Sequence, residues 1–137
     1  MNIHSDEVKT KLTEEECAVL GKGETEAPYS GEYLNTTDKG VYTCKVCGTV
    51  LFSSENKLDS SKSALGLQGW PSFSDPAVAE HIGLRADDSL GMHRTEIYCK
   101  KCGGHLGHLF AASETGEDKD HYCVNSVCLD FKAEGTV

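Results

Sequence analysis

The chain has 137 residues, of which 38% are hydrophobic and 26% charged, and its formal net charge is −9 at pH 7. A chain of this length buries about two-thirds of its unfolded surface around one core, and no apolar run reaches the roughly 18 residues of a membrane helix. The acidic balance disfavours a nucleic-acid-binding protein, because phosphates are bound by clustered lysines and arginines. We therefore expect one domain over residues 1–137, without a nucleic-acid or membrane partner.

The N-terminal segment predicts a short helix followed by an arm. Its first residues, MNIHSDEVKTKLTEEEC, lack the apolar core of a signal peptide, which favours a cytoplasmic protein. Thr13 and Glu16 have the spacing of a capping box, so we expect a helix within 11–20 that ends near Gly21. The next stretch, TEAPYSGEY (25–33), contains Pro28 and Gly31 and favours a looped or extended arm. Residues 1–39 are thus assigned to an N-terminal arm, and the core of the domain to about 12–131.

The remainder of the chain predicts antiparallel β-strands joined by polar loops. Five segments have the composition or alternation of strands: GVYTC (40–44), TVLFSS (49–54), MHRTEIYC (92–99), HLGHLF (105–110) and HYCVNSVCLDF (121–131). The first two form a hairpin, while the polar stretches 53–69 and 113–120 are expected to be loops. The predicted fold class is therefore mainly β, with antiparallel sheets and a short N-terminal helical arm.

Four of the seven cysteines occur in two matching CxxCG turns, Cys44–Cys47 and Cys99–Cys102. The glycine lets the chain fold back, and two such turns supply the four thiolates that tetrahedral zinc requires. Two disulfides are the alternative, whereas a redox CxxC pair is disfavoured because neither turn opens a βαβ unit. We therefore predict a structural Zn²⁺ site with no open position for catalysis, and no organic cofactor.

Cys123 and Cys128 lie five positions apart in the segment predicted as the last strand. In a continuous strand they would be about 16 Å apart and would face opposite sides, whereas a disulfide needs Cα atoms within about 7 Å. Asn125 shares the face of Cys123, and a buried amide without a partner costs a few kcal/mol. We therefore expect that face to open onto a site.

Several motifs follow one another in a fixed order. After the first CxxCG turn come GWPSF (69–73), GMHRTE (91–96), the second CxxCG turn, HLGHLF and YCVNS (122–126). This order resembles that of the zinc-containing B-type methionine sulfoxide reductases, from about residue 12 to residue 131. The resemblance implies a β-tent-like fold, with the zinc on the side away from catalysis. It also implies thiol-dependent reduction of the R epimer of methionine sulfoxide, mainly in proteins, by a monomer that thioredoxin or another thiol regenerates.

The resemblance further implies roles for individual residues. The catalytic group would consist of Cys123, His108, His105 and Asn125, and the substrate-binding group of Trp70, Phe110 and His121. The residue types fit this chemistry, because a thiolate attacks the sulfoxide sulfur while an imidazolium protonates the oxygen, and an indole suits an S-methyl group. The two histidines are three positions apart, so a bend or bulge at Gly107 is needed to bring both to one pocket.

The sequence departs from the family pattern at the cysteine that would resolve a Cys123 sulfenic acid. Members often carry this cysteine just before the Gly-Trp-Pro motif, where this chain has Leu67 and Gln68. Cys17 is the remaining candidate, and the alternative is that Cys17 is a packed thiol and an external thiol reduces Cys123 directly.

Two further positions differ from the family. His121 replaces the arginine that usually lies two before the nucleophile, and Ala112 replaces the usual aspartate. Glu114 or Asp118 could then orient a histidine in place of that aspartate.

A non-catalytic zinc-stapled β binding module is the alternative class of function. A pure binding module has no need of a cysteine, an asparagine, two histidines and an exposed tryptophan together. The combination therefore favours an enzyme.

Overall fold

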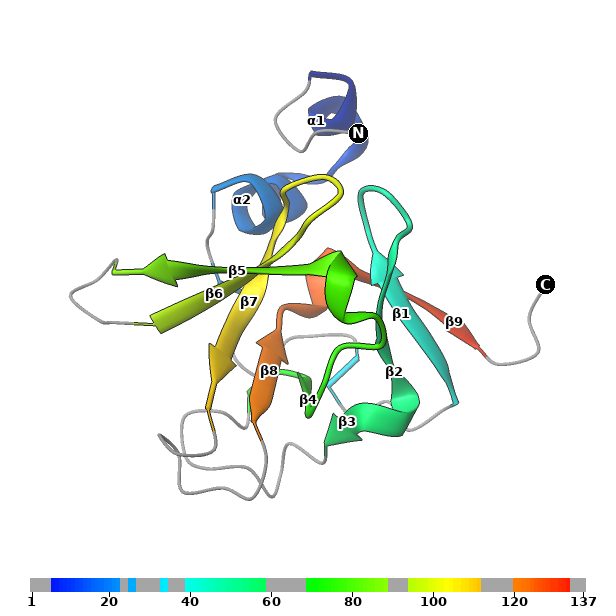
Figure 1. Cartoon of the computed structure of the whole chain (residues 1–137). Coiled ribbons are helices and arrows are strands. Elements are labelled where there is room, and N and C mark those ends of the chain that lie inside the picture. Colours follow the sequence, from blue (N-terminus) through cyan, green and yellow to red (C-terminus); the bar gives the residue numbers. More distant parts are fainter. Residues whose placement is uncertain are drawn as a thin grey trace.

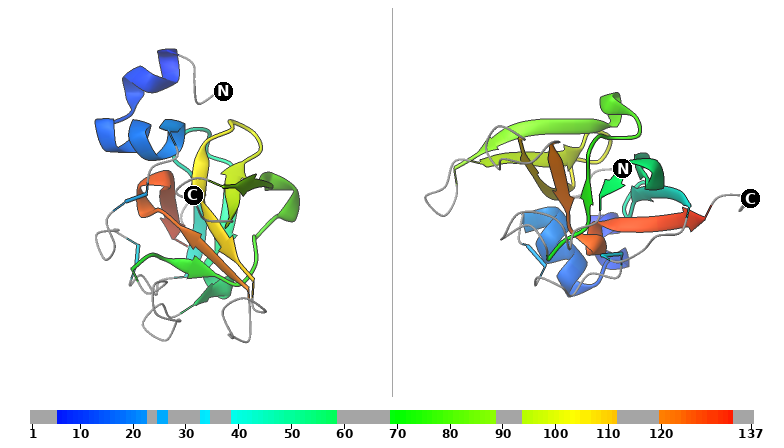
Figure 2. Two further views of the ribbon diagram at one scale, coloured as in Figure 1. Left: turned by 90° about the vertical axis from the view of Figure 1, so that its left-hand side faces the viewer. Right: turned by 90° about the horizontal axis from the view of Figure 1, so that it is seen from below.

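Two helices and two antiparallel sheets make up the described part of the chain (Figure 1). The computed structural model describes residues 6–22, 25–26, 33–34, 39–58, 69–88, 94–111 and 120–133. The helices are α1 (Asp6–Lys11) and α2 (Glu14–Lys22), and Figures 1 and 2 place both at one end of the molecule, beyond the sheets. None of the helices in these ranges is long and apolar enough to cross a membrane.

The strands form one small and one larger sheet. The three-stranded sheet has the order β2-β1-β9, with β1 (Gly40–Cys44), β2 (Val50–Ser53) and β9 (Leu129–Ala133). The six-stranded sheet has the order β3-β4-β8-β7-β6-β5, with β3 (Lys57–Leu58), β4 (Ser72–Phe73), β5 (Ile82–Asp87), β6 (Arg94–Cys99), β7 (His105–Phe110) and β8 (His121–Val124). The 3₁₀ turns are η1 (Ser54–Asn56), η3 (Ala79–His81) and η5 (Ser126–Cys128). The predicted mainly-β class is confirmed.

The capping box predicted from the sequence sets the start of α2. The Thr13 amide donates to Glu16 Oε1 at 2.9 Å, and the Glu16 amide donates to Thr13 Oγ1 at 3.1 Å. This reciprocal pair satisfies two amides that have no partner within the helix. Helix α2 then packs against β7 and η5 through the fully buried Val19 and Leu20. Helix α1 was not predicted.

The expectation of one continuous strand over 121–131 is wrong. Strand β8 ends at Val124 in the six-stranded sheet, η5 follows, and β9 begins at Leu129 in the other sheet. The chain crosses between sheets here, and the Cys128 amide donates to the Asn125 carbonyl across the turn. The argument that Cys123 and Cys128 face opposite sides of one strand therefore does not apply. Both are free thiols, and Cys128 Sγ donates to the His105 carbonyl at 3.2 Å.

Three other strands were missed or misassigned. Residues 53–58, predicted as loop, contain η1 and β3, while the rest of that loop lies outside the described residues. The short β4 and the six-residue β5 had no sequence prediction. Most of the TEAPYSGEY arm and of the 113–120 loop, with Ala112, Glu114 and Asp118, also lies outside the described residues.

An aromatic core fills the space between the two sheets. Phe52 of β2 stacks on Phe73 of β4 with ring centroids 4.5 Å apart, and Tyr42 of β1 meets Phe73 edge-on at 5.1 Å. All three side chains are fully buried. Tertiary packing of this kind fixes the sheets against each other, and so holds β4 beside β8.

Candidate functional site

One row of polar side chains crosses the six-stranded sheet in direct register. Arg85 of β5 pairs with Glu96 of β6, Glu96 with His108 of β7, His108 with Cys123 of β8, and Cys123 with Ser72 of β4. Directly opposed residues of antiparallel strands point to the same face, so the five side chains share one face of the sheet. The Cys123 thiol is therefore flanked by an imidazole on one side and a hydroxyl on the other.

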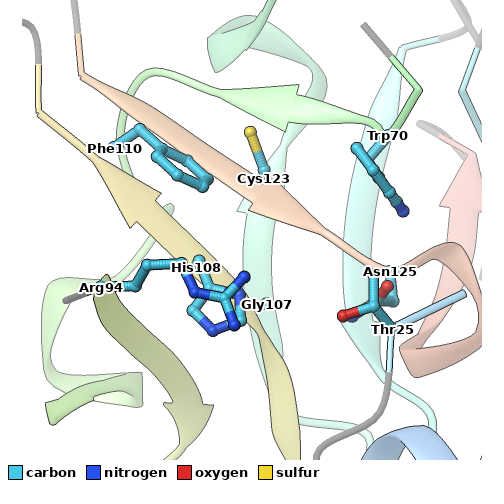
Figure 3. Close-up of a pocket in the computed structure, with 8 residues that line it drawn as sticks. All are labelled: Thr25, Trp70, Arg94, Gly107, His108, Phe110, Cys123 and Asn125. Atoms are coloured by element: carbon cyan, nitrogen blue, oxygen red, sulfur yellow. The ribbon is translucent and has the colours of Figure 1, made fainter. Parts of the chain in front are cut away.

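A cavity of about 120 Å³ opens above Cys123. Its lining residues come from three strands and from segments beside them, and they are Thr25, Trp70, Arg94, Gly107, His108, Phe110, Cys123 and Asn125 (Figure 3). Figure 3 draws Cys123 between the aromatic side chains of Phe110 and Trp70, and Arg94 next to His108. The cavity thus offers an apolar wall and polar groups to one small ligand.

Each histidine on β7 contacts a carboxylate. His108 Nε2 is 2.6 Å from Asp87 Oδ2, and His105 Nδ1 is 2.7 Å from Glu96 Oε2. A carboxylate in this position fixes the tautomer of an imidazole and stabilises the imidazolium. Neither acid was identified from the sequence: Asp87 lies on the unpredicted β5, and Glu96 lies inside the GMHRTE motif, where only its pairing reveals a role.

A β-bulge brings the two histidines together. Between β6 and β7 the register shifts, since Ile97 pairs with Gly107 but Tyr98 pairs with His105, which makes Leu106 the extra residue. The two imidazole rings lie 5.4 Å apart as a result. The irregularity that the sequence requires is present, one residue before the expected position.

Gly107 is needed for a different reason, the close approach of β7 and β8. A Cβ atom at this position would lie 1.9 Å from the Cys123 carbonyl oxygen. Only glycine therefore fits here, and the approach keeps His108 opposite Cys123.

The Cys123 thiol is buried. Burial raises its pKa to about 11, and the hydrogen bond with Ser72 Oγ, 3.2 Å away, acts in the opposite direction. The thiol therefore stays protonated at neutral pH in the substrate-free site, whereas the sequence interpretation began from a thiolate. Deprotonation must then accompany substrate binding or attack.

Arg94 brings a permanent positive charge to the cavity and was not identified from the sequence. Its Nη2 is 3.6 Å from Asp87 Oδ2, and its side chain is 21% exposed. Its Nε is buried without a hydrogen-bond partner among the described residues. A guanidinium that is only partly paired and lines a cavity is suited to bind an oxygen of the ligand.

Both polar atoms of the Asn125 side chain have a hydrogen-bond partner, and the residue is 2% exposed. Its Nδ2 donates to the Leu106 carbonyl at 3.0 Å, and its Oδ1 accepts from the Glu26 amide at 3.0 Å. The unsatisfied amide considered from the sequence does not arise. Asn125 instead ties β7 and the N-terminal segment to the wall of the cavity.

Three predicted site residues are not among those that line the cavity. His105 lies behind His108, with its Nε2 buried and without a partner in the described part of the chain. His121 is buried opposite Phe110, and its Nδ1 is also buried without a hydrogen-bond partner among the described residues. Cys17 is half-buried on α2. The structure therefore joins Trp70, His108, Phe110, Cys123 and Asn125 in one cavity and leaves these three outside it.

The four CxxCG cysteines form a second cluster, at the turns between β1 and β2 and between β6 and β7. All four sulfurs lie within 4.8 Å of one another, with Cys44–Cys102 at 3.6 Å and Cys47–Cys99 at 3.5 Å. Ligands about 2.3 Å from a tetrahedral zinc ion are roughly 3.8 Å apart, so the set fits zinc closely. No disulfide forms among the seven cysteines, all of which are described, and the alternative of two disulfides is wrong.

The local backbone geometry agrees with a metal at these turns. Gly48 and Gly103 follow the second cysteine of each pair with φ of 76° and 81°, a left-handed conformation that glycine adopts without strain. Four thiolates need a cation, and a closed zinc site supplies it.

Comparisons with known proteins give a consistent result. The model of the SelR domain matches residues 12–133. A peptide methionine sulfoxide reductase MsrB from Methanosarcina barkeri is 43% identical over 129 residues, which cover 94% of this chain and 86% of the relative. The protein of that name from Leptospira interrogans is 41% identical over 136 residues, covering 98% and 97%. The one from Bradyrhizobium diazoefficiens is 44% identical over 124 residues, covering 90% and 84%.

Proposed function

The chain belongs to the MsrB family of peptide methionine sulfoxide reductases, and we propose that its cavity binds the R epimer of methionine sulfoxide with Cys123 as the nucleophile. The activity is the reduction of methionine sulfoxide to methionine by an oxidoreductase that uses a thiol reductant. A non-catalytic binding module is therefore not retained. The observation that carries the proposed site is the register of Cys123 between His108 and Ser72 at the base of a cavity walled by aromatic rings.

Substrate binding uses the two ends of the cavity differently. The S-methyl group packs against the Trp70 and Phe110 rings, since a polarizable thioether-like group gains from aromatic contact. The sulfoxide oxygen carries partial negative charge and faces His108 and Arg94. Both of these groups lie within reach of the Asp87 carboxylate, which holds them at the same end.

In the chemical step the Cys123 sulfur attacks the sulfoxide sulfur. The thiol proton is transferred to the sulfoxide oxygen through His108, whose imidazolium is stabilised by Asp87. The oxygen passes to Cys123, which becomes a sulfenic acid and is oxidised by two electrons, and methionine leaves with its sulfur reduced by two electrons. Arg94 stabilises the charge that develops on the oxygen before the proton arrives.

Regeneration of Cys123 needs two electrons from an outside dithiol, and thioredoxin is the proposed donor. Its first thiol forms a mixed disulfide with Cys123 and releases the oxygen as water, and its second thiol frees Cys123. Cys17 would act as a resolving cysteine only if α2 left its place against β7 and η5, where Val19 and Leu20 are fully buried. We favour direct reduction of the sulfenic acid by the external thiol. The zinc site, when loaded, holds the two turns together and supplies fold stability, and no residue of the cavity belongs to it.

Further proposals concern the substrate, the assembly and the compartment. The substrate is methionine sulfoxide in proteins, because the cavity receives only one side chain and has an exposed rim at Thr25. The chain is proposed to act as a single domain and a monomer, without nucleic-acid or membrane partners. None of the seven cysteines, all of which are described, forms a disulfide, which favours a reducing compartment such as the cytoplasm.

The function is tested with resolved epimers. Purified zinc-loaded protein is incubated with the R or the S epimer of a methionine-sulfoxide peptide and dithiothreitol, and methionine is quantified. Reduction of the R epimer alone, lost in Cys123→Ser, is expected. Equal reduction of both epimers, or activity that survives Cys123→Ser, would contradict the assignment.

A further inference from the structure

Glu26 connects two walls of the cavity through its main chain. Its amide donates to Asn125 Oδ1 at 3.0 Å, and its carbonyl accepts from Trp70 Nε1 at 3.0 Å. Trp70 precedes β4 and Asn125 follows β8, and both line the cavity. One residue of the N-terminal segment thus fixes an indole and an amide that come from different parts of the chain. Its neighbour Thr25 adds to the cavity rim.

The Glu26 side chain anchors this residue. It is only 3% exposed, and its Oε1 accepts from the Val127 amide at 3.1 Å, on η5 immediately after Asn125. Its Oε2 is buried and has no hydrogen-bond partner among the described residues. Burial raises the pKa of this carboxyl, and the backbone amides of Ser126 and Val127 act in the opposite direction.

A buried carboxyl with one unpartnered oxygen is a costly way to stabilise a fold. An apolar side chain of the same size would avoid the unpaired oxygen, but it would leave the Val127 amide without its acceptor. The glutamate therefore fills a specific need, an acceptor for the Val127 amide that ties the Glu26 segment to η5. That tie constrains the position of its main chain relative to Trp70 and Asn125.

We propose that Glu26 is a positioning residue of the reductase: its carboxyl holds the N-terminal segment on η5, and its main chain thereby sets the orientation of the Trp70 indole and the Asn125 amide. The inference rests on the proposed function, since it assigns a part in that reaction to a residue that does not touch the substrate. Without the anchor, both hydrogen bonds from the main chain weaken together. The wall for the S-methyl group then shifts relative to Cys123.

The chain offers an optical readout of this arrangement, because Trp70 is its only tryptophan. Emission of the protein therefore reports the surroundings of one cavity wall, with or without turnover. Loss of the hydrogen bond to the Glu26 carbonyl and entry of water beside the indole shift the emission to longer wavelength.

The experiment compares Glu26→Ala, Glu26→Asp and Glu26→Gln with Glu80→Ala, which removes an exposed carboxylate on η3. Each zinc-loaded protein is measured for thermal unfolding, tryptophan emission and kcat/KM with an R-methionine-sulfoxide peptide. Displacement of a reacting group by about 1 Å costs on the order of 100-fold, and we expect a loss of about 10- to 100-fold for Glu26→Ala, together with a red shift.

The conservative variants separate positioning from mere stability. Glutamine reaches Val127 with its amide oxygen, so Glu26→Gln is expected to restore wild-type emission and to bring kcat/KM within about threefold of wild type. Aspartate is one methylene too short to reach Val127, so Glu26→Asp is expected to show the same loss of kcat/KM and the same red shift as Glu26→Ala. It supplies the test if Glu26→Ala does not fold. Glu80→Ala stays at wild-type values in all three measurements.

Unchanged emission and kcat/KM in folded Glu26→Ala and Glu26→Asp would overturn the inference, as would a Glu26→Gln variant as impaired as Glu26→Asp. These results are distinct from failure of the proposed function. A wild-type protein that reduces no methionine sulfoxide refutes the function, whereas the emission comparison needs no turnover and still tests the anchor.

Discussion

His108 Nε2 lies 2.6 Å from Asp87 Oδ2, so β7 and β5 make contact across the intervening strand β6 through their side chains. The same imidazole belongs to the residue directly opposite Cys123. Asp87 therefore contacts His108, and His108 lies opposite Cys123. This arrangement favours proton transfer by His108 when the Cys123 sulfur attacks the substrate.

Asp87→Asn tests this arrangement. Asparagine keeps the size of the side chain but no longer stabilises an imidazolium, so kcat for methionine sulfoxide reduction is expected to fall by about 100-fold with little change in thermal stability. Steady-state kinetics with an R-methionine-sulfoxide peptide provide the measurement. The exposed Asp75→Asn is the matched control and keeps wild-type kcat. An Asp87→Asn enzyme as fast as wild type would show that Asp87 does not assist proton transfer by His108.

Arg94→Met distinguishes two ways in which the guanidinium could meet the substrate. If Arg94 binds the sulfoxide oxygen, kcat/KM falls by a similar factor, about 100-fold, for the peptide and for dimethyl sulfoxide, which has no backbone. Arg94→Lys keeps the charge and loses less. A loss confined to the peptide would place Arg94 on the peptide backbone instead of the reacting oxygen.

The raised pKa of Cys123 predicts how the substrate-free thiol reacts with pH. Since its pKa is about 11, the thiolate fraction rises about tenfold per pH unit, and alkylation by iodoacetamide accelerates about 100-fold from pH 7 to pH 9. The rate is read from the Cys123 peptide by mass spectrometry, because six other cysteines are present. Ser72→Ala removes the contact that opposes the shift and slows alkylation at each pH. A rate that is flat over this range would show a thiolate already formed.

Loss of one zinc ligand is expected to destabilise the fold. Structural zinc contributes on the order of 10 kcal/mol to the folding of small metal domains, so Cys99→Ser should bind less than one equivalent of zinc and unfold at a markedly lower temperature. Atomic absorption and thermal unfolding are measured together. Cys17→Ser, which lies outside the cluster, serves as control and retains its zinc. Full zinc content and an unchanged unfolding temperature in Cys99→Ser would contradict the site.

Local patterns were sufficient to predict the parts of the fold that local contacts determine. The capping box of α2, the β1–β2 hairpin and the two CxxCG turns each depend on residues close in sequence, and all three are present. An irregularity near Gly107 was also predicted, because two histidines three apart face opposite sides of a regular strand, and the structure has a bulge there.

The rest depends on contacts between distant segments. The alternation of residues 121–131 continues through Asn125, and only the arrangement of two sheets shows that the chain changes sheet there. Asp87 and Glu96 become partners of the histidines through strand pairing, and Glu26 through a contact with residues about a hundred positions away. Such partners carry no local signal in one sequence.

The most direct test of Cys123 as the nucleophile is a single turnover without reductant. Zinc-loaded protein is mixed with an excess of R-methionine-sulfoxide peptide, trapped with dimedone and mapped by mass spectrometry. We expect about one methionine per chain, with dimedone on Cys123 and Cys17 still a thiol. A Cys17–Cys123 disulfide would confirm Cys123 as the nucleophile. It would also show that Cys17 resolves the sulfenic acid and that α2 moves during the cycle. Methionine formed while Cys123 remains an unmodified thiol would contradict the assignment of Cys123 as the nucleophile.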